Sequence, residues 1–126
     1  MSNITVQSIV DEAPIIAIIR RPKVDPVRCI EHLFQNGIRL VEITMDTPGA
    51  VEVLKAQHSR VPANALLGAG TVTNVAEAEA ALAAGATFIV TPNIYSRHRW
   101  GKRFIGPAVR FYCERGTWIL LAGYCV

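Results

Sequence analysis

A single carboxylate stands in the middle of an apolar stretch of this chain. The segment Leu40-Val-Glu-Ile-Thr-Met-Asp-Thr47 has the composition of a short buried strand, with Glu42 near its centre. A charge on a buried strand is costly unless it is paired or used in chemistry. Because strand side chains alternate between two faces, Glu42, Thr44 and Asp46 are expected on one face and the apolar residues on the other. The pattern therefore predicts a strand that lines a site.

Polar residues also stand where the other strands are expected to end. Arg20 follows one apolar run, Thr71 follows Gly70, and Thr91-Pro-Asn93 closes a further run. In parallel α/β architectures the carboxyl ends of the strands form the site. A cation, a carboxylate, hydroxyl groups and exposed glycine backbone suit a small oxyanionic ligand such as a keto acid. The residues alone indicate a site for a small anionic metabolite, with acid–base chemistry.

The elements that must position these residues are apolar runs alternating with helical patterns. Predicted strands start at intervals of about 25, 25 and 21 residues, and the first, a continuous apolar run, is expected to be covered on both faces. Asp25 is an expected N-cap with Pro26 behind it, and Gly37 and Gly85 are expected C-caps. The predicted ranges are helix 6–12, strand 15–19, helix 25–36, strand 40–47, helix 48–58, strand 65–71, helix 74–84 and strand 86–90.

This alternation predicts an α/β fold with parallel strands and right-handed crossovers. A (β/α)8 TIM barrel is favoured over a dinucleotide-binding sheet, because Gly68-Ala-Gly70 lacks a third glycine and lies within a strand end. Residues 1–95 supply about four βα units, whereas a complete barrel typically needs about 200 residues or more. The expected fold class is therefore a partial (β/α)8 TIM barrel, its N-terminal half. A possible fifth strand covers residues 118–121.

The composition changes sharply near residue 96. Residues 1–95 hold seven Lys or Arg and nine Asp or Glu, whereas residues 96–126 hold six Lys or Arg and one acid, Glu114. The second segment also holds both tryptophans, and the βα periodicity is lost at about residue 97. Three explanations are open: a natural divergent end, a nucleic-acid-binding appendage, or a reading-frame shift that also truncates the protein. The abrupt gain of Arg, Trp and Cys favours the frame shift, and no recognition motif supports nucleic-acid binding.

Composition also bounds the class of protein. With 51% hydrophobic and 18% charged residues the chain is globular. No apolar run approaches the roughly 18 residues that span a bilayer, and the N-terminus does not have the pattern of a secretory signal. Three widely spaced cysteines without metal-ligand spacing favour a reduced compartment. A cytoplasmic protein without a membrane or nucleic-acid partner is expected.

Four runs of the chain, taken in order, resemble a known family. The chain is similar to the 2-keto-3-deoxy-6-phosphogluconate (KDPG) / 4-hydroxy-2-oxoglutarate (KHG) aldolases over about residues 10–95. The closing Thr91-Pro-Asn-Ile94 looks more like the 2-dehydro-3-deoxy-6-phosphogalactonate branch, where other members have Ser-Pro-Gly. The matching runs are Ile16-Ala-Ile-Ile-Arg20, Gly37-Ile-Arg-Leu-Val-Glu-Ile-Thr44, Leu67-Gly-Ala-Gly-Thr-Val72 and Ala83-Ala-Gly-Ala-Thr-Phe-Ile-Val-Thr-Pro-Asn93.

The resemblance implies a homotrimeric TIM barrel and a class I aldolase that uses no metal or other cofactor. Such an enzyme reversibly cleaves a phosphorylated 2-keto-3-deoxy sugar acid to pyruvate and glyceraldehyde 3-phosphate. A lysine amine forms a Schiff base with the keto carbon, and a glutamate shuttles protons through water. Matched by position, the glutamate is Glu42, the threonine that holds the pyruvate carboxylate is Thr71, a pocket residue is Pro92, and the arginine near the polar groups of the substrate is Arg20.

The chain departs from the family pattern in two places. Asp46 stands where the family often has an arginine, so a repelling charge replaces a carboxylate binder, although the galactonate branch tends to carry a neutral polar residue there. The Schiff-base lysine belongs to a Lys-(Phe/Ile/Leu)-Phe-Pro run that is not found, and the phosphate-binding glycine loops of the last two strands are not found either. The lysines of the sequence are Lys23, Lys55 and Lys102. The expected function is that of a lyase-family protein, truncated and inactive alone; the alternative is a non-catalytic ligand-binding or assembly fragment.

Structural roles compete with the functional ones. Glu42 could form an ion pair inside the barrel with Arg20, and Arg20 could instead be a solvated loop cation. Thr71 could cap the following helix or bond within a turn. Three further residues are expected to be structural: His32 and His58 on helix surfaces, and Cys29 as a packing thiol.

Overall fold

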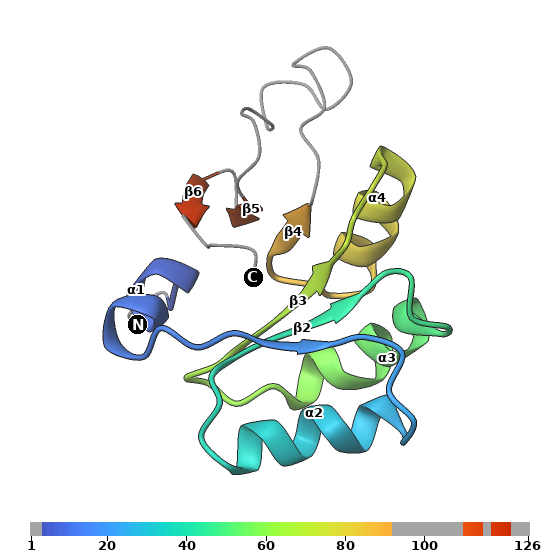
Figure 1. Ribbon diagram of the computed structural model, residues 1–126, viewed down its shortest axis with the longest axis horizontal. Helices are drawn as coiled ribbons and strands as arrows, with labels where there is room; N and C mark the ends of the chain where they lie inside the picture. Colours follow the sequence, from blue (N-terminus) through green and yellow to red (C-terminus); the bar gives the residue numbers. More distant parts are fainter. Residues whose placement is uncertain (1–3, 92–109, 115–116, 122–126) are drawn as a thin grey trace.

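The structure, a computed structural model, describes residues 4–91, 110–114 and 117–121. Helices and strands alternate through most of this part of the chain (Figure 1). In chain order the elements are α1 (Val6–Glu12), β1 (Ala17–Ile19), α2 (Pro26–Gln35), β2 (Leu40–Thr44), α3 (Ala50–Gln57), a 3-10 turn (His58–Arg60), β3 (Leu66–Gly70), α4 (Val75–Ala83), β4 (Ile89–Thr91), β5 (Arg110–Glu114) and β6 (Thr117–Leu121).

The strands form one sheet in the order β1-β2-β3-β4-β5-β6. The first four strands pair in parallel with their chain neighbours, which confirms the predicted βα alternation. β5 and β6 add as an antiparallel hairpin on β4. The predicted fifth strand, residues 118–121, lies in β6, but it is not a parallel continuation of the barrel pattern.

One face of the sheet is covered by α2, α3 and α4 and carries the larger core. The register aligns Ile19, Ile43 and Ala69 across the first three strands, and all three are buried. α2 contributes the fully buried Ile30, while Val27, Leu33 and Phe34 of the same helix pack against this cluster at partial burial. This face is the helix-covered face that βα crossovers produce.

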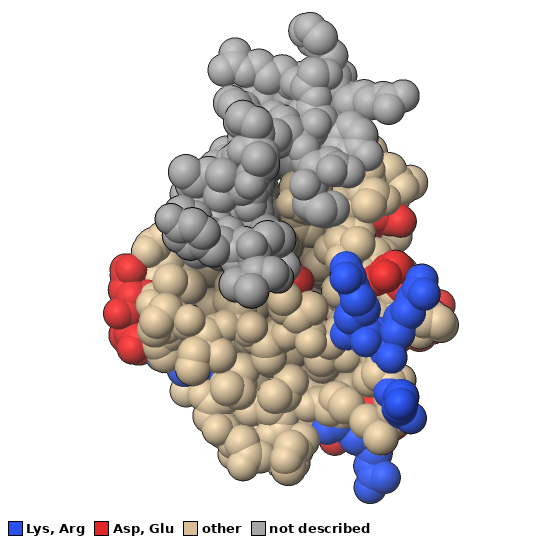
Figure 2. All heavy atoms as spheres, viewed as in Figure 1, with Lys and Arg blue, Asp and Glu red and all other residues tan. Residues whose placement is uncertain are grey.

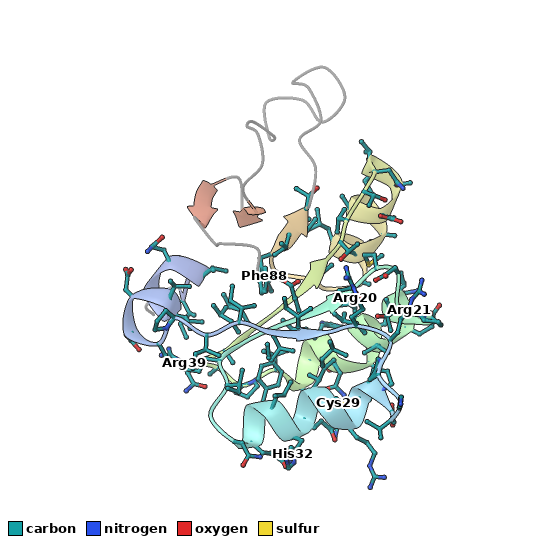
Figure 3. The ribbon with its side chains drawn as sticks, in the orientation of Figure 1. Arg20, Arg21, Cys29, His32, Arg39 and Phe88 are labelled. Atoms are coloured by element: carbon teal, nitrogen blue, oxygen red, sulfur yellow. The ribbon has the colours of Figure 1, made fainter. Side chains whose placement is uncertain are left out.

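The opposite face, called the inner face below, is covered at the amino ends of the strands by α1. Val6 and Ile9 of α1 are fully buried in a second apolar cluster with residues of β2 and β3 such as Leu40. Arg39 ties α1 to the sheet, because it forms an ion pair with Glu12 of α1 and donates a 2.8 Å hydrogen bond from Nε to the carbonyl of Asn64. Figure 3 shows Arg39 on the side of the sheet where α1 lies.

The predicted N-cap of α2 and the predicted glycine C-caps of α2 and α4 are confirmed. Asp25 caps α2 by accepting a 3.0 Å hydrogen bond from the amide of Val27, and Pro26 follows at the first helical position. Gly37 and Gly85 have φ of +87° and +105° and terminate α2 and α4 with the paired amide–carbonyl bonds of a Schellman motif. The longest of the described helices, α2, has 10 residues, and none of them is long and apolar enough to cross a membrane.

Several predicted strand ranges are too long. β1 begins at Ala17, because the amide of Ile15 bonds back to the carbonyl of Ala13 at 2.8 Å. β1 is also not covered on both faces, since the side chains of Ile15 and Ile18 are 57% and 44% exposed. β4 starts at Ile89 because the amide of Ala86 still closes the C-terminus of α4. Helix 48–58 was also predicted too long, since α3 spans Ala50–Gln57.

Gly68 in β3 is required by close packing across the inner face. A Cβ at this position would lie 2.6 Å from the ring of Phe88, which is fully buried. The aromatic ring therefore occupies the volume that a side chain of residue 68 would need. This contact brings the polypeptide before β4 against β3.

Gly68→Ala is expected to destabilise the protein by about 1–3 kcal/mol, because a close-packed ring must shift to admit the methyl group. Phe88→Leu is expected to cost less free energy in the Gly68→Ala background than in the native one, because the smaller side chain leaves room for Cβ. Urea unfolding of both single variants and the double variant measures this coupling. Additive free energies would contradict the packing described here.

Candidate active site

The candidate site lies at the carboxyl ends of β1, β2 and β3, where the sequence predicts it. Side chains of the β1–α2, β2–α3 and β3–α4 connections meet there, from segments up to 51 residues apart in the chain. Figure 3 shows Arg20 and Arg21 together at this end of the sheet, and Figure 2 shows basic side chains gathered on the same side with acidic atoms between them. The parallel pairing of β1, β2 and β3 places the carboxyl ends of these strands side by side.

Glu42 is buried on the inner face, with 3% of its surface exposed. In the register it stands between Ile18 of β1 and Gly68 of β3. Its carboxylate leans over Gly70, since a Cβ at Gly70 would lie 2.3 Å from Oε1 of Glu42. The sequence prediction of a buried carboxylate on a site-lining strand agrees with this placement. Gly70 is what makes room for it.

Thr71 follows β3 directly and has an unusual backbone conformation. Its φ is +52°, in the left-handed region, which a β-branched residue rarely occupies. Its hydroxyl accepts a 2.6 Å hydrogen bond from Nη2 of Arg20. The alternative of Thr71 as a helix cap does not hold, because Asn74 caps α4 through its bond with the amide of Glu77.

The sequence pattern predicted that β2 continues through Asp46, but the structure shows that it does not. β2 ends at Thr44, and the chain then turns, with the amide of Thr47 bonding to the carbonyl of Thr44 at 3.0 Å. The turn carries Asp46 toward the end of β1. There Oδ1 lies 3.6 Å from Nε of Arg20, and Oδ2 lies 3.7 Å from Nε of Arg21. The Arg20 contacts in the structure are therefore to Thr71 and Asp46.

The environment of Asp46 favours its ionised form. A hydrogen bond from the hydroxyl of Thr44 is the main reason that the pKa of Asp46 lies below its ordinary value of 3.8, and partial burial acts in the opposite direction. The guanidinium groups of Arg20 and Arg21 lower this pKa further. Asp46 is therefore a carboxylate at neutral pH.

Arg21 belongs to the site although the sequence pattern gave it no role, and it bonds to Thr47 at the end of the predicted strand 40–47. The amide of Arg21 donates to the hydroxyl of Thr47 at 3.0 Å, and Nε of Arg21 donates to the carbonyl of Asp46 at 3.1 Å. The hydroxyls of Thr44 and Thr47 are 2.9 Å apart. These hydrogen bonds link the turn after β2 to the end of β1. The pair Arg20-Arg21 at the end of the first predicted strand was the sequence feature that could have indicated a role for Arg21.

Pro92 and Asn93 are outside the described residues, as is Lys102. His32 and His58 are exposed and Cys29 packs against the core, as expected. Lys23 and Lys55 are exposed on the β1–α2 loop and on α3. Among the described residues, no lysine lies on the inner face beside Glu42, and no group of three or more His, Cys, Asp or Glu could hold a metal ion.

The arrangement combines a buried acid with a polar rim. Arg20 and Thr71 offer hydrogen-bond donors at the rim. Glu42 is more deeply buried, with its carboxylate against Gly70. A carboxylate held away from bulk water can exchange a proton with a ligand. Such a site can hold a small carboxylic acid by its charged end and transfer a proton at its far end.

Comparison with known proteins decides the family. A family model described as KDPG and KHG aldolase matches residues 6–98. The chain belongs to the KDPG and KHG aldolase family. This confirms the resemblance inferred from the four sequence runs.

Relatives of both branches match this aldolase-family chain. The 2-dehydro-3-deoxy-phosphogluconate aldolase of Pseudoalteromonas atlantica is 35% identical over 91 residues, covering 71% of this chain and 42% of the relative. The probable 2-dehydro-3-deoxy-6-phosphogalactonate aldolase of Rhizobium meliloti is 31% identical over 84 residues, covering 66% of this chain and 40% of the relative. The chain thus spans less than half the length of these relatives.

Solved aldolase structures share the fold. The 2-keto-3-deoxy-6-phosphogluconate aldolase of Zymomonas mobilis aligns with a TM-score of 0.60 at 30% identity, covering 71% of this chain and 43% of that one. The KDPG aldolase of Legionella pneumophila, solved with pyruvate captured as a covalent carbinolamine intermediate, aligns with a TM-score of 0.58 at 32% identity, covering 66% and 40%. The chain therefore has an α/β fold with a parallel sheet that resembles the TIM-barrel aldolases.

Asp46→Asn is expected to lower stability at neutral pH by less than about 1 kcal/mol, because the arginines it faces are largely exposed. The folded-state pKa of Asp46 lies below its unfolded value, so its contribution is present above about pH 4 and lost as the pH falls through the folded pKa. Denaturant unfolding of both proteins at pH 7, 4 and 2.5 measures the gap between them. A gap that stays constant or widens in acid would contradict this assignment.

Proposed function

We propose that this chain provides the carboxylate side of a class I aldolase site. The reaction is cleavage of a phosphorylated 2-keto-3-deoxy sugar acid to pyruvate and glyceraldehyde 3-phosphate, and its reverse. The observation that carries the proposal is the position of Glu42, buried on the inner face of a family member and seated against Gly70. A carboxylate so placed is the proton shuttle between water, the leaving alcohol and the pyruvyl carbon.

Arg20 and Thr71 hold the carboxylate end of the keto acid in this proposal. The two side chains already share a 2.6 Å hydrogen bond, so their donors are organised before a ligand arrives. Pre-organised donors need little reordering on binding. Pro92 lines the same pocket by its match to the family motif.

We propose that the amine that would form the Schiff base is supplied neither by Lys23, exposed in the β1–α2 loop, nor by Lys55, exposed on α3. Without an amine, the covalent route through an imine is lost, and loss of an essential nucleophile typically lowers kcat by many orders of magnitude. We therefore propose that the 126-residue chain alone binds keto acids but does not turn them over. The second candidate is a non-catalytic ligand-binding or assembly fragment, favoured by the same lysine positions.

Borohydride trapping tests this proposal. The chain is incubated with pyruvate and sodium borohydride and then analysed by mass spectrometry, because reduction fixes an imine as a stable lysine adduct. No adduct is expected, since Lys23 and Lys55 are exposed and neither stands on the inner face with Glu42.

The Legionella pneumophila aldolase, whose solved structure contains a carbinolamine with pyruvate, is the positive control. A pyruvate adduct on any lysine of the present chain would overturn the proposal that it is inactive alone. If there is no adduct, pyruvate binding by a Glu42→Gln variant is compared with binding by the native chain. Equal binding would contradict the proposed role of Glu42 in the site, but it would leave the family assignment of the fold in place.

We also propose that the aldolase-like unit comprises residues 1–95 and that residues 96–126 have a different origin, through a reading-frame change near residue 97. The family match ends at residue 98, and β5 and β6 are antiparallel where a barrel would continue in parallel. Translation of the other frames of the encoding DNA beyond that point is expected to restore a Lys-(Phe/Ile/Leu)-Phe-Pro run. If neither frame restores it, a divergent end is the better explanation.

A further inference from the structure

We propose that Asp46 determines which anions the site accepts. It limits the net charge of the strand-end cluster of Arg20, Arg21 and Asp46, and so weakens the binding of a doubly charged phosphate more than that of a singly charged carboxylate. This inference rests on the proposed function, because it concerns the ligand class of the same site.

Asp46 is placed to act on both arginines at once. Its two carboxylate oxygens lie on different guanidinium groups, at 3.6 Å from Nε of Arg20 and 3.7 Å from Nε of Arg21. The turn that carries Asp46 is held by two bonds from Arg21, from its amide to the Thr47 hydroxyl and from its Nε to the Asp46 carbonyl, and by the bond from the Thr47 amide to the Thr44 carbonyl. These bonds keep Asp46 beside the arginines.

The free donor of the cluster points to where a ligand would bind. An arginine can only donate hydrogen bonds, so the hydroxyl of Thr71 accepts from Arg20 and its own proton remains available. Arg20 is also 56% exposed at its side chain and has further N–H groups. The two oxygens of a ligand carboxylate can therefore accept hydrogen bonds from both Arg20 and Thr71.

The charge count of the cluster distinguishes anions by their valence. Arg20 and Arg21 carry two positive charges at any physiological pH, and Asp46 carries one negative charge, so the cluster has a net charge of +1. An anion seated on Arg20 and Thr71 is attracted by the arginines and repelled by Asp46. The repulsion of a dianion by Asp46 is twice that of a monoanion in the same place.

This proportionality makes a sharp prediction. If neutralising Asp46 raises the affinity for a monoanion by a factor f, it should raise the affinity for a dianion by about f squared. For a charge about 6 Å away in a largely solvated setting, f is about 3, so the dianion gains about tenfold. A purely steric or ordering role for Asp46 would change both affinities by the same factor.

The experiment is an NMR titration of the full chain with pyruvate and with methyl phosphate at pH 8 and low salt. At this pH pyruvate is a monoanion and methyl phosphate a dianion, because the second pKa of a phosphate monoester is about 6. Binding is followed at the amide of Thr71 and at Nε of Arg20 and Arg21, which locates the ligand. The titrations are made on the native chain, Asp46→Asn and Asp46→Ser.

Three matched variants control the experiment. Asp11→Asn makes the same change in total charge on exposed α1, away from the site, and should leave both affinities unchanged. Asp46→Glu keeps the charge and should keep the ratio of the two affinities close to that of the native chain. Arg20→Gln should abolish the response to both anions, in the native and in the Asp46→Asn background.

The expected result is a gain of about threefold for pyruvate and about tenfold for methyl phosphate in Asp46→Asn and Asp46→Ser, reduced by 0.3 M salt. Equal gains for the two anions, or the same gains in Asp11→Asn, would overturn the inference and leave the proposed function standing. A methyl phosphate gain without any pyruvate response would support the inference and overturn keto-acid binding. No response to either anion in any variant would overturn both.

Discussion

Two glycines, Gly68 and Gly70, leave the inner face of β3 without side chains at these positions. Much of the structure depends on the space that this absence provides. The position above Gly68 is filled by the ring of Phe88, and the position above Gly70 is filled by the carboxylate of Glu42. One glycine therefore lets the chain before β4 pack closely, and the other lets β2 hold a buried acid. Any larger residue at these places would displace either a core aromatic ring or the candidate proton shuttle.

The rim of the site is held by charge and by hydrogen bonds rather than by apolar packing. Arg20, Arg21 and Asp46 join the ends of β1 and β2, and the Arg20–Thr71 bond extends the link to β3. Two residues of this rim, Arg21 and Thr71, have positive φ values of 41° and 52°. Strained backbone of this kind persists only where the surroundings hold it in place, and it concentrates at functional sites. The network around Asp46 provides that constraint.

The helices were more predictable from the sequence than the strands. Helix ends depend on neighbours within a turn or two, so Asp25, Pro26, Asn74 and the two capping glycines could be recognised one at a time. Strand ends depend on turns and distant partners, so β2 was predicted to continue to Thr47 when it turns after Thr44. The antiparallel strand β5 was not predicted from the sequence.

The candidate site shows the same division. Glu42 could be singled out because a lone acid in an apolar strand is costly, and that cost can be read from the sequence alone. The position of Asp46 could not, because its contacts to two arginines come from a turn and from the register between β1 and β2. A residue that looked like a repelling charge is one member of a balanced cluster. Arg21 was missed for the same reason.

The row of side chains through Glu42 has a further consequence for how deep this acid lies. Along the inner face, exposure falls from 44% at Ile18 on the edge strand to 3% at Glu42 on the next strand, and to zero at Phe88. Within the described part of the chain, bulk water is thus one strand away from the carboxylate. A smaller side chain at position 18 is therefore expected to bring water closer to the carboxylate while the hydrogen-bonded ladder stays closed.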